Sequence, residues 1–292
     1  MSLWLLDSGN SRLKWAMLRE PYRRGQAFAV QGVLELKGLG SPAAAFSRLF
    51  GGAAGGATMY ACNVAGPVIE RRIRAAAKRA GFAAPHFVRC SAEAAGVRNG
   101  YKEPWRLGAD RWAALIGARH EYPGRALCIV SIGTAMTIDL LAGNGQHRGG
   151  IITPGPLLMI ESLLEHTAGV RRRAGGERAS RSFERVLARP WPREFAARTA
   201  ARAAAAKQQG LRSGLYARDT HSALLAGARY ATAALIERAL TEGRRQLGRK
   251  PQLILAGGAA DAIAPLLSGP RRRADDLVLR GLAVLAAGPE AP

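Results

Sequence analysis

The chain has 292 residues, of which 48% are hydrophobic, so it is long and apolar enough to form two domain cores. The formal net charge of +22 raises affinity for nucleotides and nucleic acids without specifying either. Three cysteines without paired spacing and the lack of a secretory signal argue against a disulfide-based secreted domain, and we expect a cytoplasmic protein.

The first predicted element is a short apolar strand, Leu3 to Leu6, that enters the polar turn Asp7-Ser8-Gly9-Asn10-Ser11-Arg12-Leu13-Lys14. Glycine has no Cβ to exclude a positive φ or a close ligand, and the free N–H groups of such a turn can face phosphate oxygens. Asp7, at the end of the strand, can hold hydrated Mg²⁺, and Lys14 supplies the positive charge that nucleotide phosphates need. Alone, the motif also fits a surface hairpin, which is the commoner case.

Strands and helices then alternate up to a predicted domain boundary. The expected elements are a strand at 57–63, a helix at 67–80 that ends at Gly81, a strand at 86–89 and a helix at 107–119. Tyr122-Pro123-Gly124 follows, and we place the boundary there. The predicted domains are residues 1–122 and 123–292.

The second half opens with a hairpin that repeats the first. Between residues 126 and 142, an apolar strand enters a Gly133-Thr134 turn and a second apolar strand leaves it. Superposing Gly9 on Gly133 places Asn10 on Thr134 and Asp7 on Ser131, which suggests duplication. The polar residues inside this stretch favour a hairpin over a membrane span. Asp139 either approaches a metal or meets solvent at a strand end.

The remaining elements lead to the end of the chain. They are a loop at 149–156, a helix at 157–166, a helix at 222–244 capped by Asp219 or Thr220, a strand at 252–256 that enters Gly257-Gly258, and a helix at 276–287. An arginine-rich insertion at about 170–218 stands apart and contains a predicted helix at 194–207. We interpret it as a mobile basic segment, either solvated surface or a nucleic-acid contact.

The chain lacks the P-loop pattern Gly-x-x-x-x-Gly-Lys-Ser/Thr, so phosphate binding would depend on the twin hairpins. Six motifs, in order, resemble those of the type III pantothenate kinases, a family of the actin, hexokinase and Hsp70 superfamily that includes the Bvg accessory factor proteins. The motifs are Asp7-Ser8-Gly9-Asn10-Ser11 with Lys14; Asn99-Gly100-Tyr101 before Leu107-Gly108-Ala109-Asp110-Arg111-Trp112; Gly133-Thr134-Ala135 with Thr137 and Asp139; Gly149-Gly150 with Pro154-Gly155 and Met159; Asp219-Thr220; and Ala256-Gly257-Gly258.

The resemblance implies an α/β fold of two duplicated ribonuclease H-like domains. It also implies ATP-dependent phosphorylation of pantothenate to 4'-phosphopantothenate, the first step of coenzyme A biosynthesis, by a homodimer that uses Mg²⁺. The implied ATP contacts are Asp7, Ser8, Gly9, Asn10, Ser11, Arg12, Leu13, Lys14 and Thr134, with Asp7 also near Mg²⁺. The implied catalytic base is Asp110, and the other implied substrate contacts are Tyr101, Gly108, Ala109, Arg111 and Thr220.

One position departs from the family pattern. Most members carry an aspartate where this chain has Ser131, and that aspartate helps to hold a monovalent cation such as K⁺ or NH₄⁺. A serine offers one neutral oxygen, so we expect weak or absent dependence on that cation. The alternative function is a regulatory or nucleic-acid-binding protein of the Bvg accessory factor type, but a base beside a phosphate clasp, Asp110 with Asp7 and Lys14, favours the enzyme.

Overall fold

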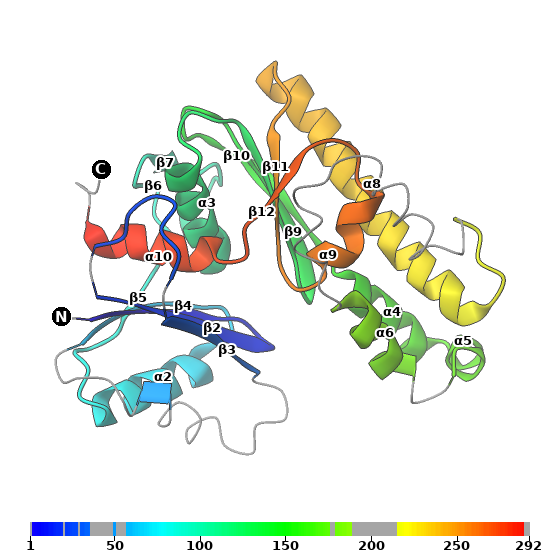
Figure 1. The fold of residues 1–292 in the computed structure, drawn as a ribbon, viewed down its shortest axis with the longest axis horizontal. Helices are drawn as coiled ribbons and strands as arrows, with labels where there is room; N and C mark the ends of the chain where they lie inside the picture. Colours follow the sequence, from blue (N-terminus) through cyan, green and yellow to red (C-terminus); the bar gives the residue numbers. More distant parts are fainter. Residues whose placement is uncertain are drawn as a thin grey trace. The chain divides into compact units, whose positions relative to one another are not determined.

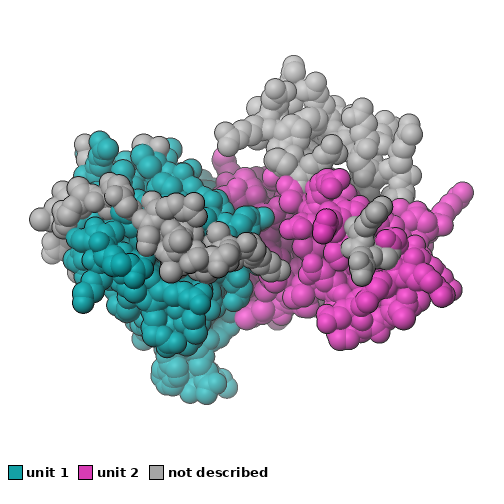
Figure 2. Space-filling model, turned by 90° about the horizontal axis from the view of Figure 1, so that it is seen from below, with its two compact units in different colours: residues 1–125, 141–149, 276–292 teal, residues 126–140, 150–275 magenta. Residues whose placement is uncertain are grey.

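The computed structural model describes residues 2–19, 21–28, 30–35, 49–50, 57–175, 179–188 and 215–288. The chain divides into two compact units (Figures 1 and 2). Unit 1 comprises Met1–Arg125, Leu141–Gly149 and Asp276–Pro292, and unit 2 comprises Ala126–Leu140 and Gly150–Asp275.

Unit 1 is built on a five-stranded sheet in the order β3-β2-β1-β4-β5. Its strands are β1 (Leu3–Ser8), β2 (Arg12–Leu18), β3 (Val30–Glu35), β4 (Thr58–Asn63) and β5 (His86–Phe87). The first three are antiparallel neighbours, and β4 and β5 run parallel to β1. Helix α2 (Pro67–Arg79) covers one face, while α3 (Ala109–Glu121) and α10 (Leu277–Ala287) cover the other (Figure 1).

Three short elements complete unit 1 on the side of α3. Strands β6 (Glu93–Ala94) and β7 (Val97–Arg98) pair as a small hairpin, and the 3₁₀ helix η1 (Pro104–Arg106) precedes α3. The loop that joins β7 to η1 carries Tyr101, so these elements place a predicted substrate contact beside the start of α3.

The second sheet has the order β10-β9-β8-β11-β12. Its strands are β8 (Leu127–Ile132), β9 (Ala135–Leu141), β10 (His147–Pro154), β11 (Gln252–Ala256) and β12 (Arg271–Arg273). The helices are α4 (Pro156–His166), α5 (Ala168–Arg173), α6 (Ala179–Leu187), α8 (Thr220–Leu247), α9 (Ala260–Ile263) and the 3₁₀ helix η4 (Ala264–Leu266). Apolar residues of α8 and α9 pack on the sheet to form one core.

The two sheets have the same strand order, which confirms the predicted α/β fold with a duplicated ribonuclease H-like arrangement. In each half, three consecutive strands (β1–β3 or β8–β10) come before two parallel strands (β4 and β5, or β11 and β12). A helix follows the last of these strands, α3 in the first half and α10 in the second. The halves at 1–122 and 123–292 remain a prediction. They differ from the compact units because α10 crosses α3 closely: a Cβ at Gly281 would lie 1.8 Å from the carbonyl oxygen of Ala113.

Three expectations differ from the structure. The segment at 149–156, expected as a loop, lies largely in β10, an edge strand where glycine and a terminal proline are tolerated. Strands β3, β6, β7 and β12 were not predicted. Within the predicted insertion, α5 and α6 contribute to a packed cluster in which Phe183 is fully buried, so the interpretation as a mobile or solvated segment is wrong for that part. The helix predicted at 194–207 lies outside the described residues.

The stretch from 126 to 142 forms the hairpin β8–β9, as predicted. In the described part of the chain, no helix combines the length and the apolar character that crossing a membrane requires.

Candidate functional site

The hairpin β1–β2 places the predicted phosphate-binding residues at the end of a buried strand. Asp7 lies opposite Lys14 across the antiparallel pair, and Cys62 of β4 is its neighbour on the other side. Because side chains alternate along a strand, these three share one face of the sheet, while Leu6 and Leu13 join the core under α2. The face that carries Asp7 and Lys14 is therefore the one covered by α3 and α10.

The turn between these strands is closed by one backbone hydrogen bond, in which the Gly9 N–H donates to the Arg12 carbonyl at 2.9 Å. Gly9 does not have a positive φ, and a Cβ there would meet the nearest atom at an ordinary 3.4 Å. The turn conformation therefore does not require glycine. The expectation that Gly9 is needed for a positive φ is wrong. The other expectation, close approach of an anion, remains a prediction.

The other residues of the turn lie in different environments. Asn10 is exposed and Ser11 is half-buried. Arg12 pairs with Glu35 of the adjacent strand at 2.7 Å, an exposed ion pair of little energetic value. Ser8 is fully buried, and its hydroxyl has no hydrogen-bond partner within the described residues. Because Ser8 follows Asp7 in β1 and side chains alternate along a strand, the Ser8 side chain lies on the opposite face of the sheet from Asp7.

Two carboxylates interact at this face of unit 1. Burial raises the pKa of Asp7 from its ordinary 3.8 to about 6, the Lys14 ammonium lowers it, and the Asp110 carboxylate raises it again. Asp110 lies in the first turn of α3, where its Oδ1 accepts a hydrogen bond from the Arg111 N–H at 2.8 Å. Asp7 is half-buried, and an acid whose pKa is raised by desolvation and by a second acid is typical of a functional site.

The start of α3 is shaped around Asp110. A Cβ at Gly108 would lie 2.6 Å from Asp110 Oδ1, so the carboxyl group occupies space that only glycine leaves open. Ala109 begins the helix and is half-buried, and Arg111 is buried. The Arg111 guanidinium donates to the Tyr101 hydroxyl at 2.7 Å. The structure thus brings together the predicted substrate contacts Tyr101, Gly108, Ala109 and Arg111 around Asp110.

Sequence reasoning missed two thiols beside the acids. Burial raises the pKa of Cys90 to about 11; Asp110 raises it further and Arg111 lowers it. The Cys90 thiol donates to the Leu107 carbonyl at 3.0 Å. Burial, and then Asp7, raise the pKa of Cys62 well above its ordinary value. Both thiols are therefore protonated at neutral pH. The one available signal was that Cys62 ends a strand, as Asp7 does.

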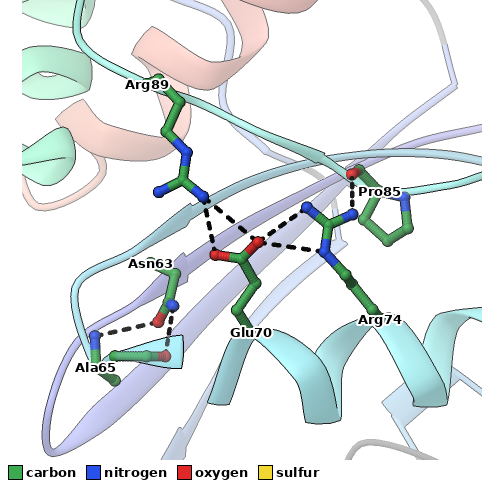
Figure 3. A network of polar contacts seen from close by, with 7 residues as sticks. Asn63, Ala65, Glu70, Arg74, Pro85 and Arg89 are labelled. Atoms are coloured by element: carbon green, nitrogen blue, oxygen red, sulfur yellow. Dashed lines mark hydrogen bonds and ion pairs between the residues drawn. The ribbon is translucent and has the colours of Figure 1, made fainter. Parts of the chain in front are cut away.

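The corner between β4 and α2 is fixed by polar contacts (Figure 3). The Asn63 side chain accepts from the Ala65 N–H at 3.1 Å and donates to the Gly66 carbonyl at 2.9 Å. Glu70 of α2 pairs with Arg74 at 2.9 Å and with Arg89 at 3.2 Å. Because Arg89 directly precedes Cys90, these contacts tie α2 to the segment that approaches Asp110.

Unit 2 carries the second hairpin, which matches the first. The Gly133 N–H donates to the Ala135 carbonyl at 3.0 Å, as Gly9 does to Arg12, although the second turn is one residue shorter. Ser131 and Thr134 are exposed. Counting from the equivalent bonds, Lys14 corresponds to Thr137, so the second hairpin has neutral residues where the first has Asp7 and Lys14.

Two glycines hold the second hairpin in place. The Gly155 N–H donates to the Thr134 carbonyl at 2.8 Å, and a Cβ at Gly155 would lie 2.0 Å from the Gly133 carbonyl oxygen. Gly257 has a φ of +92°, and a Cβ there would lie 2.4 Å from the Ile132 carbonyl oxygen. The predicted Gly257-Gly258 turn therefore packs directly on the second hairpin. Asp139 is buried, so its interpretation as an acid that meets solvent is wrong.

Thr220 begins α8, and Asp219 is the N-cap, accepting from the Ser222 N–H at 2.8 Å. The alternative that Thr220 is itself the cap is therefore wrong. The next residue, His221, stacks on Phe183 of α6 with ring centroids 4.2 Å apart, and its Nε2 lies 3.3 Å from Ser182 Oγ. Helix α6 thus supports the start of α8 and, with it, Thr220.

A hollow of about 600 Å³ in unit 2 lies among α4, α5 and α6 and is lined by Glu161, Glu165 and Arg171, among others. It contains none of the predicted site residues. Groups of three or more acids, histidines or cysteines that could bind a metal ion without help from a substrate do not occur within the described residues.

Comparisons with known proteins agree with one another: a family model matches the first part of the chain, and relatives match nearly all of it. The family model described as type III pantothenate kinase matches residues 3–188. A type III pantothenate kinase of Aromatoleum aromaticum is 37% identical over 288 residues, covering 97% of this chain and 96% of that protein. One of Burkholderia thailandensis is 38% identical over 283 residues, with the same two coverages.

Solved structures show similarity of fold at low sequence identity. A protein of Campylobacter jejuni assigned to the Baf family of transcriptional activators aligns with a TM-score of 0.50 and 17% identity, covering 99% of this chain and 100% of that one. The ethanolamine utilization protein EutJ of Carboxydothermus hydrogenoformans aligns with a TM-score of 0.51 and 11% identity, covering 97% and 89%.

Proposed function

The chain belongs to the type III pantothenate kinase family, and from this premise we propose which of its residues carry out the reaction. The enzyme phosphorylates pantothenate with ATP, the first step of coenzyme A biosynthesis. The observation that supports the site assignment is the interaction of Asp7 and Asp110 beside Lys14, on the face of unit 1 that also carries Tyr101 and Arg111. The relatives that match nearly the whole chain are named as kinases, and the Baf-family structure, at 17% identity, shows the fold alone, so the comparisons favour the enzyme over the regulatory or nucleic-acid-binding alternative.

Asp110 acts as the base. The pantothenate hydroxyl oxygen forms a bond to the γ-phosphorus of ATP, the bond from that phosphorus to the β–γ bridging oxygen breaks, and Asp110 accepts the hydroxyl proton. Phosphoryl transfer depends mostly on positioning and charge stabilisation. The close fit of Gly108 against Asp110 Oδ1 fixes the carboxyl group, and the Arg111 N–H holds the same oxygen. Tyr101, Ala109, Arg111 and Thr220 bind pantothenate.

Lys14 stabilises the phosphate charge that develops during transfer. The backbone of the turn from Ser8 to Leu13 contributes N–H groups toward the ATP phosphates, and the family motif supports Thr134 of the second hairpin as a further ATP contact. Asp7 fits a magnesium site, because Mg²⁺ in such enzymes is held by one or two carboxylates together with substrate phosphates. When bound, the ion neutralises phosphate charge, and it favours the ionised form of Asp7.

The test is direct detection of phosphopantothenate by mass spectrometry after incubation with ATP, Mg²⁺ and pantothenate. Asp110→Asn keeps the shape of the side chain and removes the base, so we expect kcat to fall roughly 10²- to 10⁴-fold. Glu93→Gln, which removes an exposed carboxylate from β6, is the matched control. Wild-type protein that forms no phosphopantothenate would refute the function, and an undiminished Asp110→Asn variant would refute the role of the base.

We propose that the enzyme depends weakly or not at all on K⁺ or NH₄⁺. Ser131 supplies a neutral oxygen at the end of β8, in the position where Asp7 supplies a carboxylate at the end of β1. Initial rates in sodium, potassium and ammonium buffers should agree within about two-fold, and Ser131→Asp should introduce stimulation by K⁺. A rate that collapses without K⁺ would contradict the proposal.

The family resemblance also supports a homodimer and a cytoplasmic location, which we propose on that basis. The described cysteines, Cys62, Cys90 and Cys128, are free thiols. Size-exclusion chromatography with light scattering tests the dimer: a mass near twice 31.0 kDa is expected, and a monomer across the micromolar range would contradict it.

A further inference from the structure

His147 is a fully buried histidine, 1% exposed, that no role assigned so far explains. It begins β10, and its imidazole stacks on the Tyr101 ring with centroids 5.9 Å apart and planes inclined by 15°. Tyr101 is the residue proposed to contact pantothenate. The buried His147 imidazole therefore packs directly on a residue of the proposed substrate site.

The segment around His147 is joined to the Tyr101 loop through the backbone. Arg98 of β7 bridges to Gln146, and its N–H donates to the Gly145 carbonyl at 2.9 Å. A Cβ at Gly100 would lie 2.1 Å from the His147 carbonyl oxygen, so the two backbones touch at that point. The Gly100 N–H also donates to His147 Nδ1 at 3.4 Å. His147 therefore contacts the loop with its main chain and with its ring.

Tyr101 is held from more than one direction. Its N–H donates to Asn99 Oδ1 at 3.0 Å, and its hydroxyl accepts from Arg111 at 2.7 Å. The Arg111 guanidinium also lies 5.4 Å from the ring centroid, and His147 stacks on the ring. Loops are mobile unless they are tied down, so these contacts select one ring orientation before substrate arrives.

We propose that His147 is a positioning residue for pantothenate binding, acting through Tyr101. The inference rests on the proposed role of Tyr101 in the site. A ring fixed in advance loses less freedom when the ligand binds, and support from a strand is more rigid than support from another loop. The expected consequence is specific: loss of His147 weakens pantothenate binding and leaves ATP binding and the phosphoryl-transfer step nearly unchanged.

The experiment measures KM for both substrates and kcat in two variants. His147→Leu removes the ring and the Nδ1 acceptor, and we expect the pantothenate KM to rise roughly 3- to 10-fold, as for the loss of one aromatic pair. The ATP KM and kcat should stay within about two-fold. His147→Phe keeps the flat ring and should restore most of the pantothenate KM.

A second Tyr–His pair in unit 1 provides the matched control. His86 stacks on Tyr60 with centroids 5.0 Å apart, away from the predicted substrate contacts in sequence, so His86→Leu should leave all three constants unchanged. A double-mutant cycle then tests the route: in a Tyr101→Leu background, His147→Leu should add no further increase to the pantothenate KM.

Several results would overturn the inference. A His147→Leu variant that lowers kcat and raises both KM values together with a lower melting temperature indicates a merely structural role. Full additivity with Tyr101→Leu, or a Tyr101→Leu variant with an unchanged pantothenate KM, excludes action through Tyr101. These outcomes require an active wild-type enzyme, so they are distinct from failure of the proposed function, in which the wild type forms no phosphopantothenate.

Discussion

Replacing Asp7 by asparagine should make the protein more stable at neutral pH while it destroys activity. Burial, opposed by Lys14 and reinforced by Asp110, raises the pKa of Asp7 from 3.8 to about 6. A rise of this size corresponds to about 3 kcal/mol. The folded state binds the Asp7 proton more tightly than the unfolded state does, so stability decreases as pH rises from about 4 to about 6, and the whole cost is present above pH 7.

Asp7→Asn removes this titration and keeps the size of the side chain. We expect the variant and the wild type to have similar free energies of unfolding near pH 4, and the variant to be more stable by up to about 3 kcal/mol at pH 8. Urea unfolding followed by tryptophan fluorescence measures the difference, since the stacked indoles of Trp4 and Trp15 lie in the same sheet. We expect kcat of the variant to fall roughly 100-fold or more.

The matched control is Glu165→Gln, which removes an exposed carboxylate from α4 in the other unit. Its stability relative to the wild type should not depend on pH in this way. If the stability difference between Asp7→Asn and the wild type is the same at pH 4 and at pH 8, Asp7 titrates normally, and the argument for two interacting acids at the site fails.

Three further predictions use close contacts in the structure. Gly108→Ala places a methyl group 2.6 Å from Asp110 Oδ1 and should lower kcat roughly 100-fold in steady-state assays, whereas Gly227→Ala, in open space on α8, should not; equal activities would contradict the fit around the base. Gly281→Ala brings a methyl group 1.8 Å from the Ala113 carbonyl and should destabilise the protein by about 1–3 kcal/mol in chemical unfolding; unchanged stability would mean that α10 does not pack so closely. Phe183→Ala should lower the free energy of unfolding by about 3–5 kcal/mol because α6 belongs to a core. A decrease below about 1 kcal/mol would show that α6 does not contribute to that core.

The sequence predicted elements whose signal is local. The twin hairpins combine continuous apolar strands with glycine turns, and their recurrence predicted the duplication that the two strand orders confirm. Strand β3 escaped prediction because it is an edge strand with mostly exposed residues, including Val33 at 58% exposure, and it therefore lacks a buried face. Strand β10 escaped because its glycines and proline are typical of loops, and only its position at a sheet edge makes them compatible with a strand.

The site was predictable as far as its motifs are contiguous. Tyr101 and the residues from Gly108 to Arg111 stand close in sequence and meet in the structure. Cys62 and His147 carry no such signal, because strand register and a loop crossing bring them to the site from distant segments. The raised pKa of Asp7 also depends on a carboxylate more than 100 residues away, so it follows from the tertiary structure alone.

The difference between the two hairpins is best explained by function rather than by folding. Ionising Asp7 is unfavourable because the surrounding protein desolvates its half-buried carboxyl group, and the protein keeps this residue beside Lys14 despite a cost of about 3 kcal/mol. Ser131 occupies the equivalent position but is exposed, so an aspartate there would carry little burial penalty. Having serine rather than aspartate at position 131 therefore gives the folded protein no stability advantage comparable to the cost at Asp7. Its consequence lies instead in the binding role that we propose for the second hairpin: contact with a nucleotide through backbone groups held by Gly155 and Gly257, without the charge that would attract a monovalent cation.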